Sequence, residues 1–255
     1  MEILVELAPP RRRSELESFL SCTREYVDCY DIPESPLGYP SPNAIATSIY
    51  VKEVTSKCVI PHIRLYDVNT NGLLSLAYAA YLYGVDGIVL TRGDKPKYGS
   101  IVEDVDTEKA ITFLKKKIPD LRIGAIISLR YPLSEIKKRI SIGADFFLVL
   151  RLGRETIEKY VEVNDIAREN DVELYPYIIV STSKNKNLLN KIDHPVLSLS
   201  EVDAFINRYK HLFKGILVSC PVDLDGLLKT LKIINRSRAV SQKSLQQQQY
   251  SQASL

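Results

Sequence analysis

Gly87-Ile88-Val89-Leu90-Thr91 is a short apolar run that stops at Arg92-Gly93-Asp94, where a charged loop begins. Unbroken runs of aliphatic and β-branched side chains are typical of parallel strands that are covered on both faces. Seven further runs of this kind occur, at residues 3–7, 27–31, 59–65, 123–129, 146–152, 174–180 and 215–219. The pattern therefore predicts eight buried parallel strands, most of which end in polar residues.

Segments with helical spacing separate these runs. They lie at residues 14–26, 42–57, 71–83, 107–117, 134–142 and 156–170, and residues 223–234 follow the last strand. Eight strands that alternate with helices in a chain of 255 residues match a closed (β/α)8 barrel. An open doubly wound sheet would usually carry a GxGxxG turn after its first strand, and none is present here. We predict a single-domain TIM barrel over residues 1–237.

Residues 238–255 differ in composition from the rest of the chain, since they are polar and contain four consecutive glutamines. Such a segment has too little apolar surface to offset the entropy lost on ordering. We therefore expect a disordered tail that contributes little to stability.

The overall composition excludes several classes of partner. Lys and Arg number 34 against 31 Asp and Glu, a net charge of +3 without a long basic block, which argues against nucleic acid. No apolar run approaches the roughly 18 residues that indicate a membrane span. The three histidines have no metal-binding spacing, and the four cysteines have no CxxC pair. These features predict reduced thiols, no metal site and a cytoplasmic location.

In a TIM barrel the carboxyl ends of the strands form one rim, where active sites lie. Glu6 is the first candidate there, because it ends an apolar strand just before Pro9-Pro10 and glutamate is rarely buried without a role. Asp31, Arg130 and Arg151 also lie at or next to the ends of predicted strands and are predicted to line the substrate pocket. Further polar residues at the predicted rim are His62, Arg64, Asp67, Asp94, Ser181, Ser219 and Cys220.

Four segments occur in a fixed order along the chain, three of them at this rim and one in a passage from helix to strand. They are Glu6-Leu7-Ala8-Pro9-Pro10, Pro61-His62-Ile63-Arg64 with Asp67 and Asn69, Thr91-Arg92-Gly93-Asp94-Lys95-Pro96 with Tyr98, and the helical Ile136-Lys137-Lys138-Arg139-Ile140 before Gly143-Ala144-Asp145. In this order they resemble motifs of the methylenetetrahydrofolate reductase family, in its short archaeal or bacterial form. The resemblance extends from residue 2 to about residue 180.

The resemblance implies flavin-dependent reduction of 5,10-methylene-tetrahydrofolate, or a related tetrahydropterin, to the 5-methyl form, in one-carbon metabolism and methionine supply. It implies FAD as cofactor and NAD(P)H as electron donor, with FMN or a flavin-free enzyme as alternatives. Glu6 would be the general acid, and Asp94 the carboxylate beside flavin and substrate. The implied flavin contacts are His62, Arg92, Gly93, Asp94, Tyr98, Lys138 and Arg139.

The chemistry of this reaction suits the two carboxylates. Opening the methylene bridge requires a proton on the leaving amine, and a carboxyl group whose pKa is raised by an apolar site can supply it. The iminium cation formed next is stabilised by an anion, and Asp94 could provide one. An anion beside the flavin would also favour departure of the hydride.

Departures from the family pattern bear on the substrate. Leu150 stands where the family has a glutamine, Arg130 follows a strand that lacks the family histidine, and Cys220-Pro221 replaces an Asn-Arg pair. These changes favour an altered pterin carrier. Two other functions stay open: a flavin-binding barrel of another class, such as an amino-acid dehydrogenase or a methyltransferase-like protein, and a non-catalytic pterin-binding subunit. A homo-oligomer and an electron-donating partner subunit are also compatible with the sequence.

Structural roles are the alternative for several of these residues. Glu6 could be ion-paired in the barrel, and His62 could be a core histidine with a satisfied ring. Lys138 and Arg139 could be ordinary solvated residues of a helix.

Overall fold

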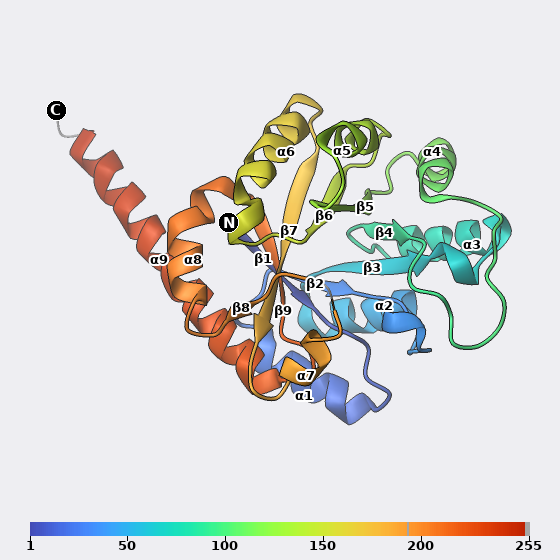
Figure 1. Cartoon of the computed structure of the whole chain (residues 1–255). Coiled ribbons are helices and arrows are strands. Elements are labelled where there is room, and N and C mark those ends of the chain that lie inside the picture. The colour runs from blue at the N-terminus through green and yellow to red at the C-terminus, as the bar shows by residue number, and fades with distance from the viewer. Residues whose placement is uncertain (193, 253–255) are drawn as a thin grey trace.

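Eight parallel strands close into a barrel in the computed structural model, which describes residues 1–192 and 194–252, with side chains through residue 239. Each barrel strand pairs with the next along the chain, and the last returns to the first (Figure 1). The predicted TIM barrel is confirmed. Its strands are β1 (Glu2–Glu6), β2 (Cys29–Ile32), β3 (Cys58–Arg64), β4 (Ile88–Thr91), β5 (Ile123–Ser128), β6 (Phe146–Leu150), β7 (Glu173–Ser181) and β9 (Gly215–Ser219).

Helices surround the barrel where helical spacing predicts them. Several begin at side chains that accept a hydrogen bond from the first turn, as Asn43, Asn69 and Asp106 do. They are α1 (Arg13–Thr23), α2 (Ala44–Thr55), α3 (Thr70–Leu82), α4 (Thr107–Lys117), α5 (Leu133–Ile140), α6 (Ile157–Glu169) and α9 (Leu224–Gln252).

The connection between β7 and β9 contains three elements that the sequence pattern does not predict. They are α7 (Lys186–Leu189), the short strand β8 (Leu197–Ser198) and α8 (Val202–Tyr209). α7 and β8 are too short to show a period. β8 pairs with the end of β7 and does not take part in closing the barrel.

The barrel interior explains why the rim is polar. Leu4, Ile60, Val89, Leu148 and Leu217 belong to one buried cluster contributed by alternate residues of successive strands. Because strand side chains alternate between faces, residues two positions further along also point inward. The apolar layers therefore place the side chains that end each strand in the mouth of the barrel.

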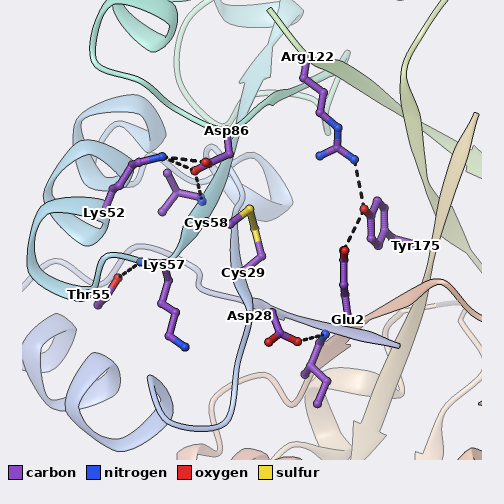
Figure 2. The surroundings of a disulfide bond; sticks show 12 residues. Glu2, Asp28, Cys29, Lys52, Thr55, Lys57, Cys58, Asp86, Arg122 and Tyr175 are labelled. Carbon is purple, nitrogen blue, oxygen red and sulfur yellow. Dashed lines mark hydrogen bonds and ion pairs between the residues drawn. A yellow bond between two sulfur atoms is a disulfide. The ribbon is translucent and has the colours of Figure 1, made fainter. Parts of the chain in front are cut away.

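A disulfide joins Cys29 and Cys58 across β2 and β3 (Figure 2). The two residues are register partners in the parallel pair, with Cα atoms 4.3 Å apart. The prediction of reduced thiols was wrong for this pair, because linear spacing does not reveal strand register. Cys22 and Cys220 are free thiols.

A polar network covers the amino-terminal end of the barrel. The Tyr175 hydroxyl lies within hydrogen-bond distance of the carboxylates of both Glu2 and Glu173, and Arg122 donates to this hydroxyl and forms an ion pair with Glu173. Figure 2 shows Glu2, Tyr175 and Arg122 in this arrangement. The network lies at the end of the barrel opposite the candidate site.

α9 continues past the predicted boundary at Ser237 and extends away from the barrel (Figure 1). Its contact with the barrel includes the ion pair between Arg238 and Asp28, at 2.6 Å. Residues 253–255 and the side chains from residue 240 onward lie outside the described residues, so the predicted disorder of 238–255 stays a prediction. Within the part of the chain that is described, no helix combines the length and apolar character that crossing a bilayer requires.

Candidate active site at the carboxyl ends of the strands

Five inward-facing polar side chains converge in the mouth of the barrel. They come from five strands: Glu6 on β1, Asp31 on β2, His62 on β3, Tyr177 on β7 and Ser219 on β9. The hydroxyls of Ser219 and Tyr177 both donate hydrogen bonds to the Glu6 carboxylate. We call this group the rim cluster. Its members lie far apart in the sequence and meet because all the strands are parallel.

Burial dominates the electrostatics of Glu6. It raises the pKa of the carboxyl group above its ordinary value, and the negative charge of Asp31 adds to the rise. The hydrogen bonds from Ser219 and Tyr177 and the charge of His62 act in the opposite direction, but the net shift is upward. Glu6 therefore holds a proton to a higher pH than a solvated glutamate does.

Asp31 and His62 form a buried pair beside Glu6. The His62 Nε2 atom lies 2.8 Å from Asp31 Oδ1, and the exposed fractions of the two residues are 8% and 1%. Burial alone lowers the pKa of His62, but the charge and hydrogen bond of Asp31, followed by the charge of Glu6, outweigh it and raise the pKa. Within the described part of the chain, the second Asp31 oxygen is buried without a hydrogen-bond partner.

Asp94 lies at the same end of the barrel as Glu6, three residues beyond the end of β4. Its position depends on Arg64, which is only 2% exposed. The Arg64 guanidinium donates to the backbone oxygens of Asp94 and Ser35, at 2.9 and 2.7 Å, and pairs with Asp67 at 2.8 Å. The prediction that Glu6, His62 and Asp94 share one rim is confirmed.

The other predicted flavin contacts are divided between the rim and a helix. Arg92, Gly93 and Tyr98 lie exposed in the loop after β4, and Lys138 is exposed on α5. Arg139 instead donates to the Ile126 backbone oxygen at 2.9 Å and forms an ion pair with Glu108. Its guanidinium thus connects α5 to α4 and to β5 on the outside of the barrel.

The predicted substrate residues also occupy different settings. Asp31 belongs to the rim cluster, whereas Arg130 is exposed and lies over the ring of Tyr131, 5.3 Å from its centroid. Arg151 follows β6 with a left-handed backbone (φ 70), and its amide donates to His194 Nε2 at 2.7 Å. Of these three, Asp31 contacts His62 of the rim cluster.

Tyr177 is the one member of the rim cluster that the sequence does not single out. Burial, followed by the charge of Glu6, raises the pKa of its hydroxyl well above the ordinary value, so it stays a donor. It lies within an apolar run, where a tyrosine is expected to pack in the hydrophobic core. One feature of the sequence could have indicated its role. Tyr177 lies two residues after Tyr175 and four before Ser181, and this even spacing places it on the inward face of β7.

The turn after β9 is occupied by a carboxylate. TIM barrels frequently bind phosphate near the loops after their seventh and eighth strands. Here Asp223 accepts the Gly226 amide at 3.1 Å and the Thr182 hydroxyl at 2.7 Å, and Lys184 lies beside it. The Asp223 carboxylate thus accepts a hydrogen bond from the first turn of α9. Its negative charge disfavours an anionic ligand at this turn.

No group of three or more His, Cys, Asp or Glu side chains in the described part of the chain is arranged to hold a metal ion.

Comparisons with known proteins agree on the fold. No protein-family model and no curated protein sequence matches the chain. Among solved structures, the tryptophan synthase complex of Pyrococcus furiosus aligns with a TM-score of 0.57 at 12% identity, covering 93% of this chain and 95% of that chain. A mandelate oxidase variant with an FMN monooxide adduct aligns with a TM-score of 0.58 at 14% identity, covering 92% and 72%. At such identities the similarity establishes the TIM-barrel fold alone.

Proposed function

We propose that the protein reduces the methylene group of a 5,10-methylene-tetrahydropterin to a 5-methyl group, with Glu6 as the general acid. The observation that carries this proposal is the state of Glu6, a half-buried carboxyl group with a raised pKa in the mouth of a TIM barrel. A group of this kind can remain protonated until a substrate needs the proton.

Glu6 would protonate the bridge nitrogen that leaves when the methylene bridge opens. Ser219 and Tyr177 both donate to its carboxylate, so they would fix its orientation and stabilise the charge left after proton transfer. The charged Asp31–His62 pair would lie beside the Glu6 carboxyl group. Asp94 would stabilise the iminium cation from the loop after β4.

The cofactor proposed is FAD, which would supply the hydride, with NAD(P)H as the electron donor. Arg92 and Lys138, both exposed, suit the phosphates, and Asp94 suits the ring edge. His62 and Arg139 fit less well, because Asp31 and Glu108 already engage them. The mandelate oxidase variant shows that this fold can hold a flavin, which supports compatibility only.

A non-catalytic pterin-binding subunit is the second candidate, since the replacement of the family glutamine by Leu150 fits a loss of activity as well as an altered pterin carrier. Single-turnover analysis separates the two functions. Protein purified, loaded with FAD and reduced by dithionite is mixed with methylene-tetrahydrofolate, and the product is identified by chromatography. We expect 5-methyl-tetrahydrofolate in amounts matching the flavin. Binding of the pterin without product would support the binding subunit. If the protein takes up neither FAD nor FMN, product formed directly from NAD(P)H would identify a flavin-free reductase.

A further inference from the structure

Two loops at the barrel mouth are joined into one unit. They are residues 35–39, after β2, and residues 92–98, after β4, and we call them the clasped loops. Arg64, on the intervening strand β3, donates to the backbone oxygen of Ser35 in one loop and of Asp94 in the other. The Lys97 amide also donates to the Gly38 oxygen at 3.0 Å. Because the anchor is a buried arginine, the pair of loops is held in place without a ligand.

The contact between the clasped loops is too close for most side chains. A Cβ atom at Gly38 would lie 2.1 Å from the Lys95 backbone oxygen, and the residue has a positive φ of 78. Ser35 and Leu37 also have left-handed backbones, with φ of 45 and 58. A leucine in this conformation is strained, so the loop adopts its shape at a cost in stability.

The strained residues support apolar groups that the core does not use. Leu37 is 48% exposed and Tyr39 is 55% exposed. Lys97 lies over one face of the Tyr39 ring, with its ammonium 5.3 Å from the centroid. The 92–98 loop contains Arg92, Lys95 and Lys97 against a single acid, Asp94, so it carries a net positive charge. The unit thus offers an aromatic and an aliphatic side chain next to cations.

These features define the chemistry of a ligand that would fit. An aryl ring stacks on tyrosine and packs on leucine, and an anionic group attached to it pairs with the lysines. A ligand whose reactive ring reached Glu6 would leave the rest of its length outside the barrel mouth, where the clasped loops lie. The strain and exposure at Leu37 are explained if that part of the ligand contacts it.

We propose that the clasped loops bind the tail of the substrate, an aryl group that carries an anionic substituent, and that Tyr39 and Lys97 determine specificity for it. The inference rests on the proposed function, because it takes the substrate to be a tailed pterin. Arg64 acts as a positioning residue that holds both loops. The anion is a carboxylate in tetrahydrofolate, whereas tetrahydromethanopterin carries a phosphodiester in addition to carboxylates, so these two compounds serve as probes of its source.

The test compares tailed and tail-less pterins on variants of the full chain. Dissociation constants are measured for tetrahydrofolate, tetrahydromethanopterin and 6-methyltetrahydropterin, which has no aryl tail. Tyr39→Ala should weaken binding of at least one tailed pterin by about tenfold and change 6-methyltetrahydropterin binding by less than about twofold. Lys97→Gln should weaken the same tailed pterin and reduce the salt dependence of its binding. Tyr83→Ala is the matched control, because Tyr83 is 60% exposed at the end of α3, which leads toward the opposite end of the barrel.

Each outcome has a distinct meaning. Equal losses for tailed and tail-less pterins, or no loss with Tyr39→Ala, would overturn the assignment of the clasped loops and leave the proposed function standing. Loss of FAD binding instead of pterin binding in Tyr39→Ala would assign the loops to the flavin and also overturn it. If the wild-type protein binds none of the three pterins, the proposed function fails, and the inference fails with it.

Discussion

Glu6 combines two properties that oppose each other at neutral pH. Its burial favours the protonated carboxyl, whereas the hydroxyls of Ser219 and Tyr177 and the charge of His62 favour the carboxylate. A group balanced in this way can release a proton to a substrate and regain it. The same balance has a measurable effect on stability.

Replacing Glu6 with glutamine should stabilise the folded protein at pH 8. The folded-state pKa is raised above the ordinary value, so the favourable contribution of the protonated group is complete below about pH 4.5. That contribution is lost as the pH rises through the folded-state pKa. Glutamine keeps the shape without the charge, and we expect a gain of about 0.5–2 kcal/mol, typical of relieving an active-site group.

Urea unfolding at pH 4 and pH 8 measures this effect, with Glu103→Gln, in the loop before α4, as an exposed control. The advantage of Glu6→Gln should shrink at pH 4. A variant that is less stable than wild type at pH 8 would indicate that Glu6 is a structural ion-pair partner.

At the scale of elements, the clasped loops depend on Gly38. Gly38→Ala should lower the free energy of unfolding by about 2–4 kcal/mol, because the new methyl group meets the Lys95 oxygen in addition to the strain of a positive φ. Gly99→Ala is the matched control, since Gly99 has a φ of 79 and no atom within 4 Å of the position of an added Cβ. It should cost only about 1–2 kcal/mol. Urea unfolding at one pH compares them, and equal losses would show that the contact between the loops is loose.

Elements with a clear period were predictable from the sequence. The eight barrel strands and seven of the helices are long enough to show an apolar run or a helical repeat. Glu6, Asp31 and His62 were predictable as rim residues for the same reason. In a parallel barrel the carboxyl ends of all the strands lie at the same end of the molecule, so a residue that ends a strand lies at the rim. α7 and β8 were not, because each is too short for a period to be visible.

Contacts between distant residues were the part that the sequence could not supply. The pairing of Cys29 with Cys58 depends on strand register, and the donation from Tyr177 to Glu6 depends on β7 lying two strands from β1 in the closed barrel. Arg139 illustrates the same limit, because a helical arginine can reach a ligand or a neighbouring helix, and here it reaches Glu108. Sequence motifs identify residue types at these positions but not their partners.

For the whole molecule, the disulfide is expected to contribute to stability. It closes a loop with a sequence separation of 29 residues, for which about 3 kcal/mol is typical. Unfolding in urea with a phosphine reductant should therefore occur at a lower midpoint, and Cys29→Ala with Cys58→Ala should reproduce the shift without reductant. Alkylation of the denatured, unreduced protein followed by mass spectrometry should label Cys22 and Cys220 only.

Labelling of all four cysteines before reduction would contradict this account of the disulfide. The result also bears on location. Disulfides are rare in cytosolic proteins outside hyperthermophiles. If the bridge is intact in protein taken from its natural cells, the predicted cytoplasmic location therefore holds only for a hyperthermophilic host.

The central claim concerns proton donation by Glu6, and one measurement tests it most directly. Protein loaded with FAD and reduced anaerobically is mixed with methylene-tetrahydrofolate in a stopped-flow instrument, and flavin re-oxidation is followed by absorbance. Glu6→Gln should bind FAD and be reduced like the wild type, because neither step requires this proton. Its re-oxidation by the pterin should be slower by about 10² to 10⁴, the usual contribution of general acid catalysis. Re-oxidation of Glu6→Gln at the wild-type rate would contradict the account.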